Sequence, residues 1–213
     1  MILKQIPRRT ILLPLAALAW NQLLYQGAFR LAEHRTHYDL STPLDRVIPL
    51  VPWTLIIYFG CFLFWGLHYL WMAARNDESA RRFYRADFLS KAVCFVIFLL
   101  LPTVMHRPES TGTGFWAAGM RFLYWMDQPY NLFPSVHCLL SWLCWVSVRG
   151  RADIPRWYRA LAFWLALAVF VSTLTTRQHV LVDIAGGVGV AELCWRAVRS
   201  SAPDTSAGRS TGR

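Results

Sequence analysis

Six long apolar stretches leave this chain few ways to fold. A bilayer core ~30 Å thick is crossed by about 20 mostly apolar helical residues. The stretches cover residues 11–29, 47–74, 88–105, 135–148, 157–175 and 179–198, and the fourth is the shortest. The pattern predicts an all-α polytopic membrane protein with six transmembrane helices.

Composition supports this interpretation. Of the 213 residues, 55% are hydrophobic and only 16% charged, against roughly 25% charged in soluble domains. An aromatic share of 15% argues against a disordered chain, which would lack such apolar surface. We expect residues 1–199 to form a single six-span domain. Residues 200–213, rich in Ser, Thr, Gly and Arg, are expected to be a disordered cytoplasmic tail.

The net charge of +10 is explained by topology. If the spans alternate from a cytoplasmic N-terminus, sixteen of the 22 Lys and Arg residues fall on the cytoplasmic side, as the positive-inside rule requires. Both termini are then cytoplasmic. Basic residues between apolar runs do not form the basic face of a nucleic-acid-binding protein, so no nucleic-acid partner is expected. A cleaved signal ending at Ala17-Leu18-Ala19 is the alternative for the first span, but its apolar character continues to Phe29.

Reactive side chains gather at the external edge of the last four spans, so we expect a helical-bundle catalytic core over about residues 88–198. Pro134-Ser135 is a typical helix start, and the free amides of a helix N-terminus bind anions. His137 would lie in that first turn. His179 and Asp183 are four residues apart, so on a helix they would share one face, with the carboxylate on the inner ring nitrogen.

Two arginines belong to the same edge: Arg107 closes the third span and Arg177 opens the sixth. Guanidinium groups and a helix N-terminus suit a phosphate group, while two histidines can supply a nucleophile and a general acid. The alternative is that His179 and Asp183 only satisfy each other inside a helix bundle. Gly186, Gly187 and Gly189 lie within a span and are interpreted as close helix packing.

These residues resemble the type 2 phosphatidic acid phosphatase superfamily, integral membrane enzymes that hydrolyse or transfer lipid phosphates. Its signatures are K-x6-R-P, P-S-G-H and S-R-x5-H-x3-D, and the resemblance covers roughly the C-terminal half of the chain. The matches are Arg107-Pro108 in the first signature, Pro134-Ser135-Val136-His137 in the second, and Ser172, His179 and Asp183 in the third.

Three positions depart from the signatures: Leu100 replaces the lysine, Val136 the glycine and Thr173 the arginine. Arg177, two residues before His179, is the candidate to replace that arginine. With these departures, the chain looks more like the branch of inositol phosphorylceramide and sphingomyelin synthases.

The resemblance implies a mechanism. His179 attacks phosphorus to give a phosphohistidine while Asp183 orients its ring, and His137 protonates the leaving alcohol and then acts as a base. Arg107, Arg177 and the amides after Ser135 hold the nonbridging oxygens. The scheme implies no metal and no other cofactor.

The function implied is a phosphatase for a lipid phosphate or diphosphate at the outer leaflet. Transfer of a phosphate-bearing head group to a lipid alcohol is the first alternative, and a small transporter or inactive scaffold is the second. The expected partners are the lipid substrate and membrane lipids. The expected location is a bacterial inner membrane with the site on the periplasmic side, because the external side has no glycosylation sequon.

Overall fold

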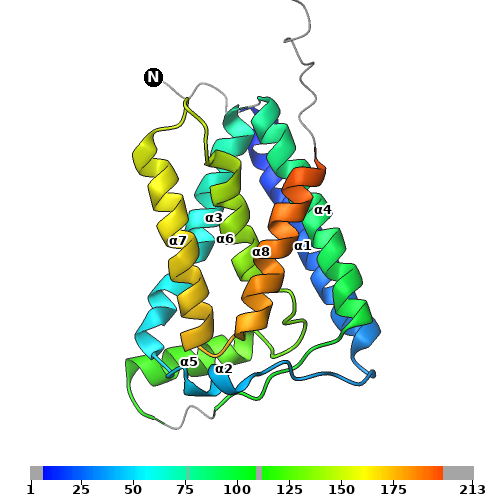
Figure 1. Ribbon diagram of the computed structural model, residues 1–213, viewed down its shortest axis with the longest axis vertical. Coiled ribbons are helices and arrows are strands. Elements are labelled where there is room, and N and C mark those ends of the chain that lie inside the picture. Colours follow the sequence, from blue (N-terminus) through cyan, green and yellow to red (C-terminus); the bar gives the residue numbers. More distant parts are fainter. Residues whose placement is uncertain (1–6, 76, 109–111, 199–213) are drawn as a thin grey trace, which may run out of the picture.

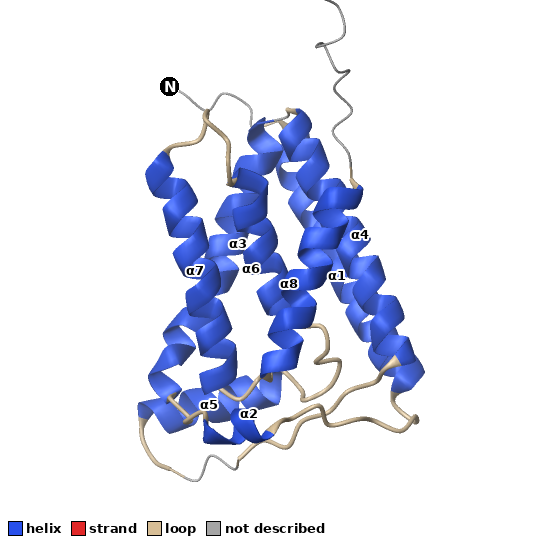
Figure 2. Ribbon diagram, in the orientation of Figure 1, coloured by secondary structure: helices blue, strands red, loops and turns tan. Residues whose placement is uncertain are grey.

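The computed structural model describes residues 7–75, 77–108 and 112–198 as a bundle of six long helices with shorter helices across one end (Figure 1). The long helices are α1 Arg8–Ala32, α3 Leu55–Arg75, α4 Glu78–Leu100, α6 Val136–Val148, α7 Arg156–Thr175 and α8 Leu181–Ala197. The short helices are α2 Pro43–Val47, the 3-10 turn η1 Pro52–Thr54 and α5 Phe115–Met126. These residues contain no strand, which confirms the all-α prediction for the described part of the chain (Figure 2).

Helix α6 occupies the centre of the bundle, where it contacts α3, α4, α7 and α8. Side chains around most of its circumference are buried, including Leu139, Leu143 and Val146. A helix that is apolar all round is stable only when it is covered on every side. Its central place therefore follows from its sequence, and it fixes the direction in which the first turn of α6 points.

Three predicted boundaries are corrected. The second stretch was predicted as one helix over 47–74, but α2 ends at Val47 and α3 begins only at Leu55, after a short 3-10 turn that starts at Pro52. The third helix begins ten residues earlier than predicted, at Glu78, where the Asp77 side chain accepts the Ala80 amide at 2.8 Å. The sixth helix begins at Leu181 rather than His179.

Membrane-spanning character is shown for only part of the bundle. Among the described residues, Pro52–Arg75 and Arg156–Thr175 are long and apolar enough to cross a membrane, judged by length and composition. Val136–Val148 is apolar but shorter. The prediction of six transmembrane helices is therefore not confirmed by helix length and hydropathy.

A buried ion pair connects α4 to its neighbours. Lys91 Nζ lies 2.8 Å from Asp87 Oδ2, and both side chains are almost fully buried. The Tyr69 hydroxyl donates to the same carboxylate, and Lys91 also reaches the Ala17 carbonyl of α1. Burying two charges is tolerated because each has a charged partner and further hydrogen bonds. This network connects α1, α3 and α4.

Candidate active site

The site forms where the first turns of α6 and α8 meet. The Ser135 amide donates to the Asp183 carbonyl at 3.0 Å. Gly187 allows this approach, because a Cβ there would lie 2.5 Å from the Ser135 carbonyl oxygen. Gly186 is similarly covered by the Phe133 ring, so the packing interpretation is confirmed for these two glycines and not for Gly189, which has no neighbour within 4 Å. This contact between Ser135 and the residues at Asp183 and Gly187 fixes the starts of α6 and α8 relative to each other; we call it the α6–α8 junction.

Two histidines from this junction face one another. The ring centroids of His137 and His179 are 5.7 Å apart. His179 is 7% exposed, and its Nδ1 lies 3.2 Å from Asp183 Oδ2. A carboxylate on Nδ1 sets the tautomer and leaves Nε2 as the ring nitrogen available for chemistry.

The contact between His179 and Asp183 arises differently from the prediction. His179 is not on a helix: it lies in the turn between α7 and α8, where the Thr173 carbonyl accepts the amides of Gln178 and His179 at 2.9 and 3.2 Å. Asp183 lies in the first turn of α8 and its Oδ2 also accepts the Val180 amide at 3.0 Å. The prediction of a shared helix face was wrong, because the carboxylate folds back as a helix-capping group.

His137 lies against aromatic rings of α3. Its centroid is 4.7 Å from that of Tyr58, 5.5 Å from Trp65 and 6.0 Å from Phe62. His137 Nε2 is buried and has no hydrogen-bond partner within the described residues. Because buried polar atoms are nearly always paired, this nitrogen is positioned to bind a group that the protein itself does not supply.

Arg107 is held beside this pair by neutral partners. Its guanidinium donates to the Asp127 carbonyl and, at 2.7 Å, to Gln178 Oε1, and it lies 5.1 Å from the Tyr124 ring centroid. Burial lowers the pKa of the guanidinium, and the nearby Asp127 carboxylate opposes that shift. An arginine pKa is so high that the group stays charged. Arg107 Nε is buried without a partner among the described groups.

The other two predicted phosphate ligands have structural partners. The Arg177 guanidinium donates to the carbonyls of Asp45 and Ile48, and its backbone adopts φ 55°, in the left-handed region. The Ser135 hydroxyl accepts the Cys138 amide at 3.2 Å and is fully buried. Of the predicted site residues, His137 and His179 line the cavity, while Asp183 and Arg107 lie behind the lining and hydrogen-bond to the lining residues His179 and Gln178. The side chains of Arg177 and Ser135 are also outside the lining, and their hydrogen bonds go to groups that do not line the cavity.

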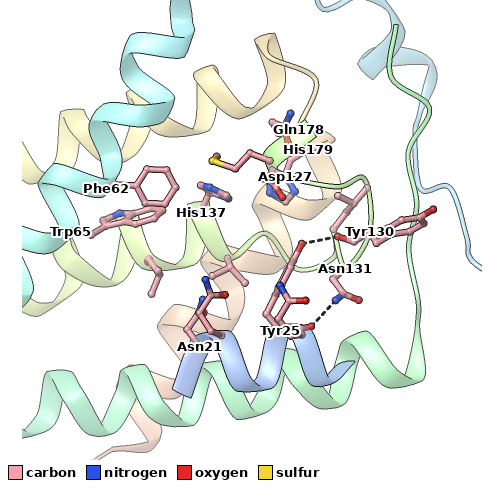
Figure 3. Close-up of a pocket in the computed structure, with 16 residues that line it drawn as sticks. Asn21, Tyr25, Phe62, Trp65, Asp127, Tyr130, Asn131, His137, Gln178 and His179 are labelled. Carbon is pink, nitrogen blue, oxygen red and sulfur yellow. Dashed lines mark hydrogen bonds between the residues drawn. The ribbon is translucent and has the colours of Figure 1, made fainter. Parts of the chain in front are cut away.

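A cavity of about 290 Å³ opens on the histidine pair. Figure 3 shows Asn21 and Tyr25 rising from α1 on one side, with His137, Phe62 and Trp65 across from them. The lining is Asn21, Gln22, Tyr25, Gln26, Phe62, Trp65, Met126, Asp127, Tyr130, Asn131, Leu132, Val136, His137, Leu140, Gln178 and His179. The site is thus a partly apolar cavity with polar groups from four parts of the chain.

Comparison with known families gives an independent result. A family model described as the PAP2 superfamily matches residues 28–197. The chain belongs to the PAP2 superfamily. Membership supports, at a coarse level, a phosphatase acting on a phosphoric ester. A comparison with curated proteins found no match.

The structure shows what occupies the positions where the PAP2 signatures carry cations. Leu100 ends α4 with 73% of its surface exposed. Thr173 is fully buried, and its hydroxyl donates to the Phe170 carbonyl at 2.9 Å. Arg177 does not replace either cation, because its guanidinium donates to the carbonyls of Asp45 and Ile48 in the segment before α3. Arg107 is therefore the signature cation that remains beside the histidines.

Sequence reasoning missed several lining residues of this PAP2 site. Asp127 follows α5, and its carboxylate accepts the Tyr58 hydroxyl. Gln178 is 1% exposed, accepts from Arg107 and keeps its Nε2 without a partner in the described structure. Asp127 and Gln178 lie in loops and belong to no periodic pattern or motif in the sequence. The sequence feature that could have identified Gln178 is its position next to His179.

The loop containing α2 is anchored onto the site by Asp45. Its Oδ1 accepts the Leu181 amide at 2.8 Å, which caps α8 from 136 residues away, and its Oδ2 accepts the Thr42 amide and hydroxyl. Burial alone would raise the pKa of this carboxyl. The hydrogen bonds from Thr42 and Leu181 outweigh burial, so the pKa lies below its usual 3.8.

We expect Asp45→Ala to destabilise the protein by about 1–2 kcal/mol near neutral pH, because it removes a helix cap. A lowered folded-state pKa stabilises the fold above the ordinary pKa, and this contribution is lost as the pH falls through the folded value. Thermal unfolding in detergent should therefore show the gap between wild type and variant closing below pH 3.8. Asp39→Ala, at an exposed loop position, is the control; an equal loss in both variants would contradict this role.

Proposed function

We propose that this protein hydrolyses a lipid phosphate or diphosphate through a phosphohistidine on His179. One observation carries the proposal. His137 and His179 line the same cavity with their ring centroids 5.7 Å apart, and the Asp183 carboxylate lies against Nδ1 of His179. Within the PAP2 superfamily, this arrangement supplies a nucleophile and a general acid.

In the first step, His179 Nε2 attacks the terminal phosphorus and an N–P bond forms; in a lipid monophosphate the P–O bond to the lipid alcohol breaks, and in a diphosphate the P–O bond to the lipid monophosphate breaks instead. His137 gives its proton to the departing alkoxide. Asp183 stabilises the positive charge that develops on the His179 ring. In the second step, His137 takes a proton from water, which attacks phosphorus and releases inorganic phosphate together with free His179.

The nonbridging oxygens need groups that bind negative charge. The proposal assigns this role to Arg107 and to the first amides of α6 after Ser135, at the positive end of the helix dipole. Arg177 could contribute only if its guanidinium left the carbonyls of Asp45 and Ile48. For this reason Arg177 is not part of the proposed phosphate-binding group.

The proposal places the six long helices in a membrane with the site at the outer leaflet. Large apolar side chains point outward along the bundle: among those more than half exposed are Leu18, Leu23, Ile56, Leu63, Leu67, Trp164 and Leu193. Exposed apolar surface of this extent favours a lipid environment. Arg75 ends α3, Arg81 and Arg82 lie near the start of α4, and Arg149 and Arg151 lie in the loop between α6 and α7. This end of the bundle is opposite α2 and α5, and its arginines support a cytoplasmic placement (Figure 1).

The test is phosphate release by detergent-purified protein from a panel of lipid phosphates and diphosphates, with EDTA present. We expect release by the wild type and a loss of roughly 10²–10⁴-fold in His137→Ala, the range for removing a general acid. Adding a lipid alcohol separates hydrolysis from head-group transfer, because transfer would yield a new phospholipid. No release and no transfer by folded wild-type protein would overturn the proposal.

A further inference from the structure

The Gln178 side chain stands between Arg107 and the cavity. It is 1% exposed and lines the cavity next to His179, whereas Arg107 lies behind the lining. Figure 3 shows Gln178 and His179 at the same end of the cavity. The Arg107 guanidinium donates to Gln178 Oε1 at 2.7 Å. Because a guanidinium can only donate, the carboxamide oxygen faces Arg107 and the N–H bonds of Nε2 point away from it.

Nε2 of Gln178 is buried and has no hydrogen-bond partner within the described residues. Asn131 offers a contrast, because it is also buried and lines the cavity, and its amide donates to the Tyr25 carbonyl at 3.1 Å. A buried amide nitrogen is nearly always paired in a folded protein. The unpaired Nε2 therefore indicates an acceptor atom that the protein itself does not supply.

Unpaired buried atoms concentrate at this site. Six buried side-chain atoms of the described residues lack a hydrogen-bond partner, and four of them are Arg107 Nε, His137 Nε2, Gln178 Nε2 and Asp183 Oδ1. The atoms of Arg107 and Gln178 can only donate, and His137 Nε2 donates when the ring is protonated. A phosphoryl group presents several strong acceptor oxygens to such donors. The cluster therefore suits a phosphoryl group better than a neutral or cationic ligand.

The backbone places Gln178 beside the position from which a signature cation is missing. Thr173 stands where the PAP2 signature has arginine, and its carbonyl accepts the Gln178 amide at 2.9 Å. Arg177 directs its guanidinium to the carbonyls of Asp45 and Ile48, whereas the next side chain lines the cavity. A neutral donor is thus available at the cavity next to the place of the absent arginine.

We propose that Gln178 is a catalytic residue whose Nε2 donates to a nonbridging oxygen of the phosphoryl group that His179 attacks. This inference rests on the proposed hydrolysis at His179. Arg107 acts through the same carboxamide, because its donation to Oε1 polarises the amide and makes Nε2 a stronger donor. The hydrogen bond strengthens as negative charge develops on the nonbridging oxygens in the transition state. Gln178 itself forms no covalent bond.

The test replaces Gln178 with Met, which is of similar length and removes the amide donor. Initial rates are measured in detergent with a lipid phosphate that the wild type hydrolyses, beside a size-exclusion profile. We expect kcat to fall roughly 10²–10³-fold, the range for removing one donor to a developing oxyanion, with little change in KM. Gln128→Met is the matched control and should leave the rate unchanged, because Gln128 is exposed, lies outside the cavity lining and donates to the Trp125 carbonyl.

An Arg107→Met background separates direct contact with the phosphoryl group from support of Arg107. If Gln178 only positioned Arg107, Gln178→Met would have no further effect in this background. The proposal expects a further fall in kcat of about 10-fold, the worth of a neutral hydrogen bond. Should Gln178→Met fail to fold, Gln178→Glu replaces it: this variant keeps an acceptor for Arg107 but has no amide donor, so its kcat should fall at least as far.

The results distinguish this inference from the proposed function. A wild-type kcat in either folded Gln178 variant, or no further loss in the Arg107→Met background, would overturn the role of Gln178 while the proposed function stands. If the wild type releases phosphate from no lipid phosphate, the proposed function fails and this inference fails with it.

Discussion

Replacing His179 with Ala is expected to lower phosphate release by at least ~10³-fold, because loss of a covalent nucleophile removes the reaction path itself. The protein should keep its fold. The His179 side chain contributes one hydrogen bond, to Asp183, and the Thr173 carbonyl would still accept the residue 179 amide. The measurement is initial rate in detergent beside a size-exclusion profile.

Two comparisons make the His179 result specific. His34→Ala removes a histidine whose side chain is 92% exposed and should leave the rate unchanged. Asp183→Asn keeps a side chain of the same size but removes the charge that stabilises the His179 imidazolium, so the rate should fall while the fold is retained. A folded His179→Ala protein with wild-type rate would show that the nucleophile lies elsewhere.

Replacing Gly187 with Ala should have the largest effect on the fold. The new Cβ would lie 2.5 Å from the Ser135 carbonyl oxygen and 3.1 Å from the Leu139 amide nitrogen, and these are backbone atoms that cannot rotate away. Overpacking of this kind costs about 1–3 kcal/mol. For a chain of this size, each kcal/mol lowers the Tm by roughly 2–4 °C.

Gly189→Ala is the matched control for Gly187, since a Cβ at residue 189 meets nothing within 4 Å. It should be neutral or slightly stabilising, because alanine favours a helix over glycine by about 0.5–1 kcal/mol. Gly187→Ala should also reduce turnover, because pushing α6 from α8 separates His137 from His179. Equal Tm values for the two variants would contradict the tight α6–α8 junction.

Local sequence signals predicted much of the fold and part of the site. The Pro134-Ser135 helix start and the apolar run after it place α6 within one residue of its observed start, because capping is decided by neighbouring residues. The spacing of His179 and Asp183 predicted their contact, although the helix begins two residues later than expected. In both cases the interaction lies within four positions along the chain.

The remaining features depend on contacts between distant residues. The Asp45 side chain caps α8 although it lies 136 residues before Leu181. The Asp45 carbonyl also accepts a hydrogen bond from the Arg177 guanidinium, which is why that side chain does not line the cavity. Asp127 and the amides of α1 reach the site only through the packing of α1 against α3 and α4. A single sequence carries no signal for contacts between residues this far apart in the chain. Arg177 was therefore predicted as a phosphate ligand, and Asn21 was not identified as a cavity residue.

The measurement that tests the central claim most directly is trapping of the phosphoenzyme. Protein mixed with a lipid substrate labelled at the phosphate and quenched in alkali within milliseconds should carry an alkali-stable, acid-labile label on a peptide containing His179. The label should be absent from His179→Ala and should persist longer in His137→Ala, which lacks the base for the second step. Rapid turnover by the wild type with no label on His179 at any quench time would contradict the account.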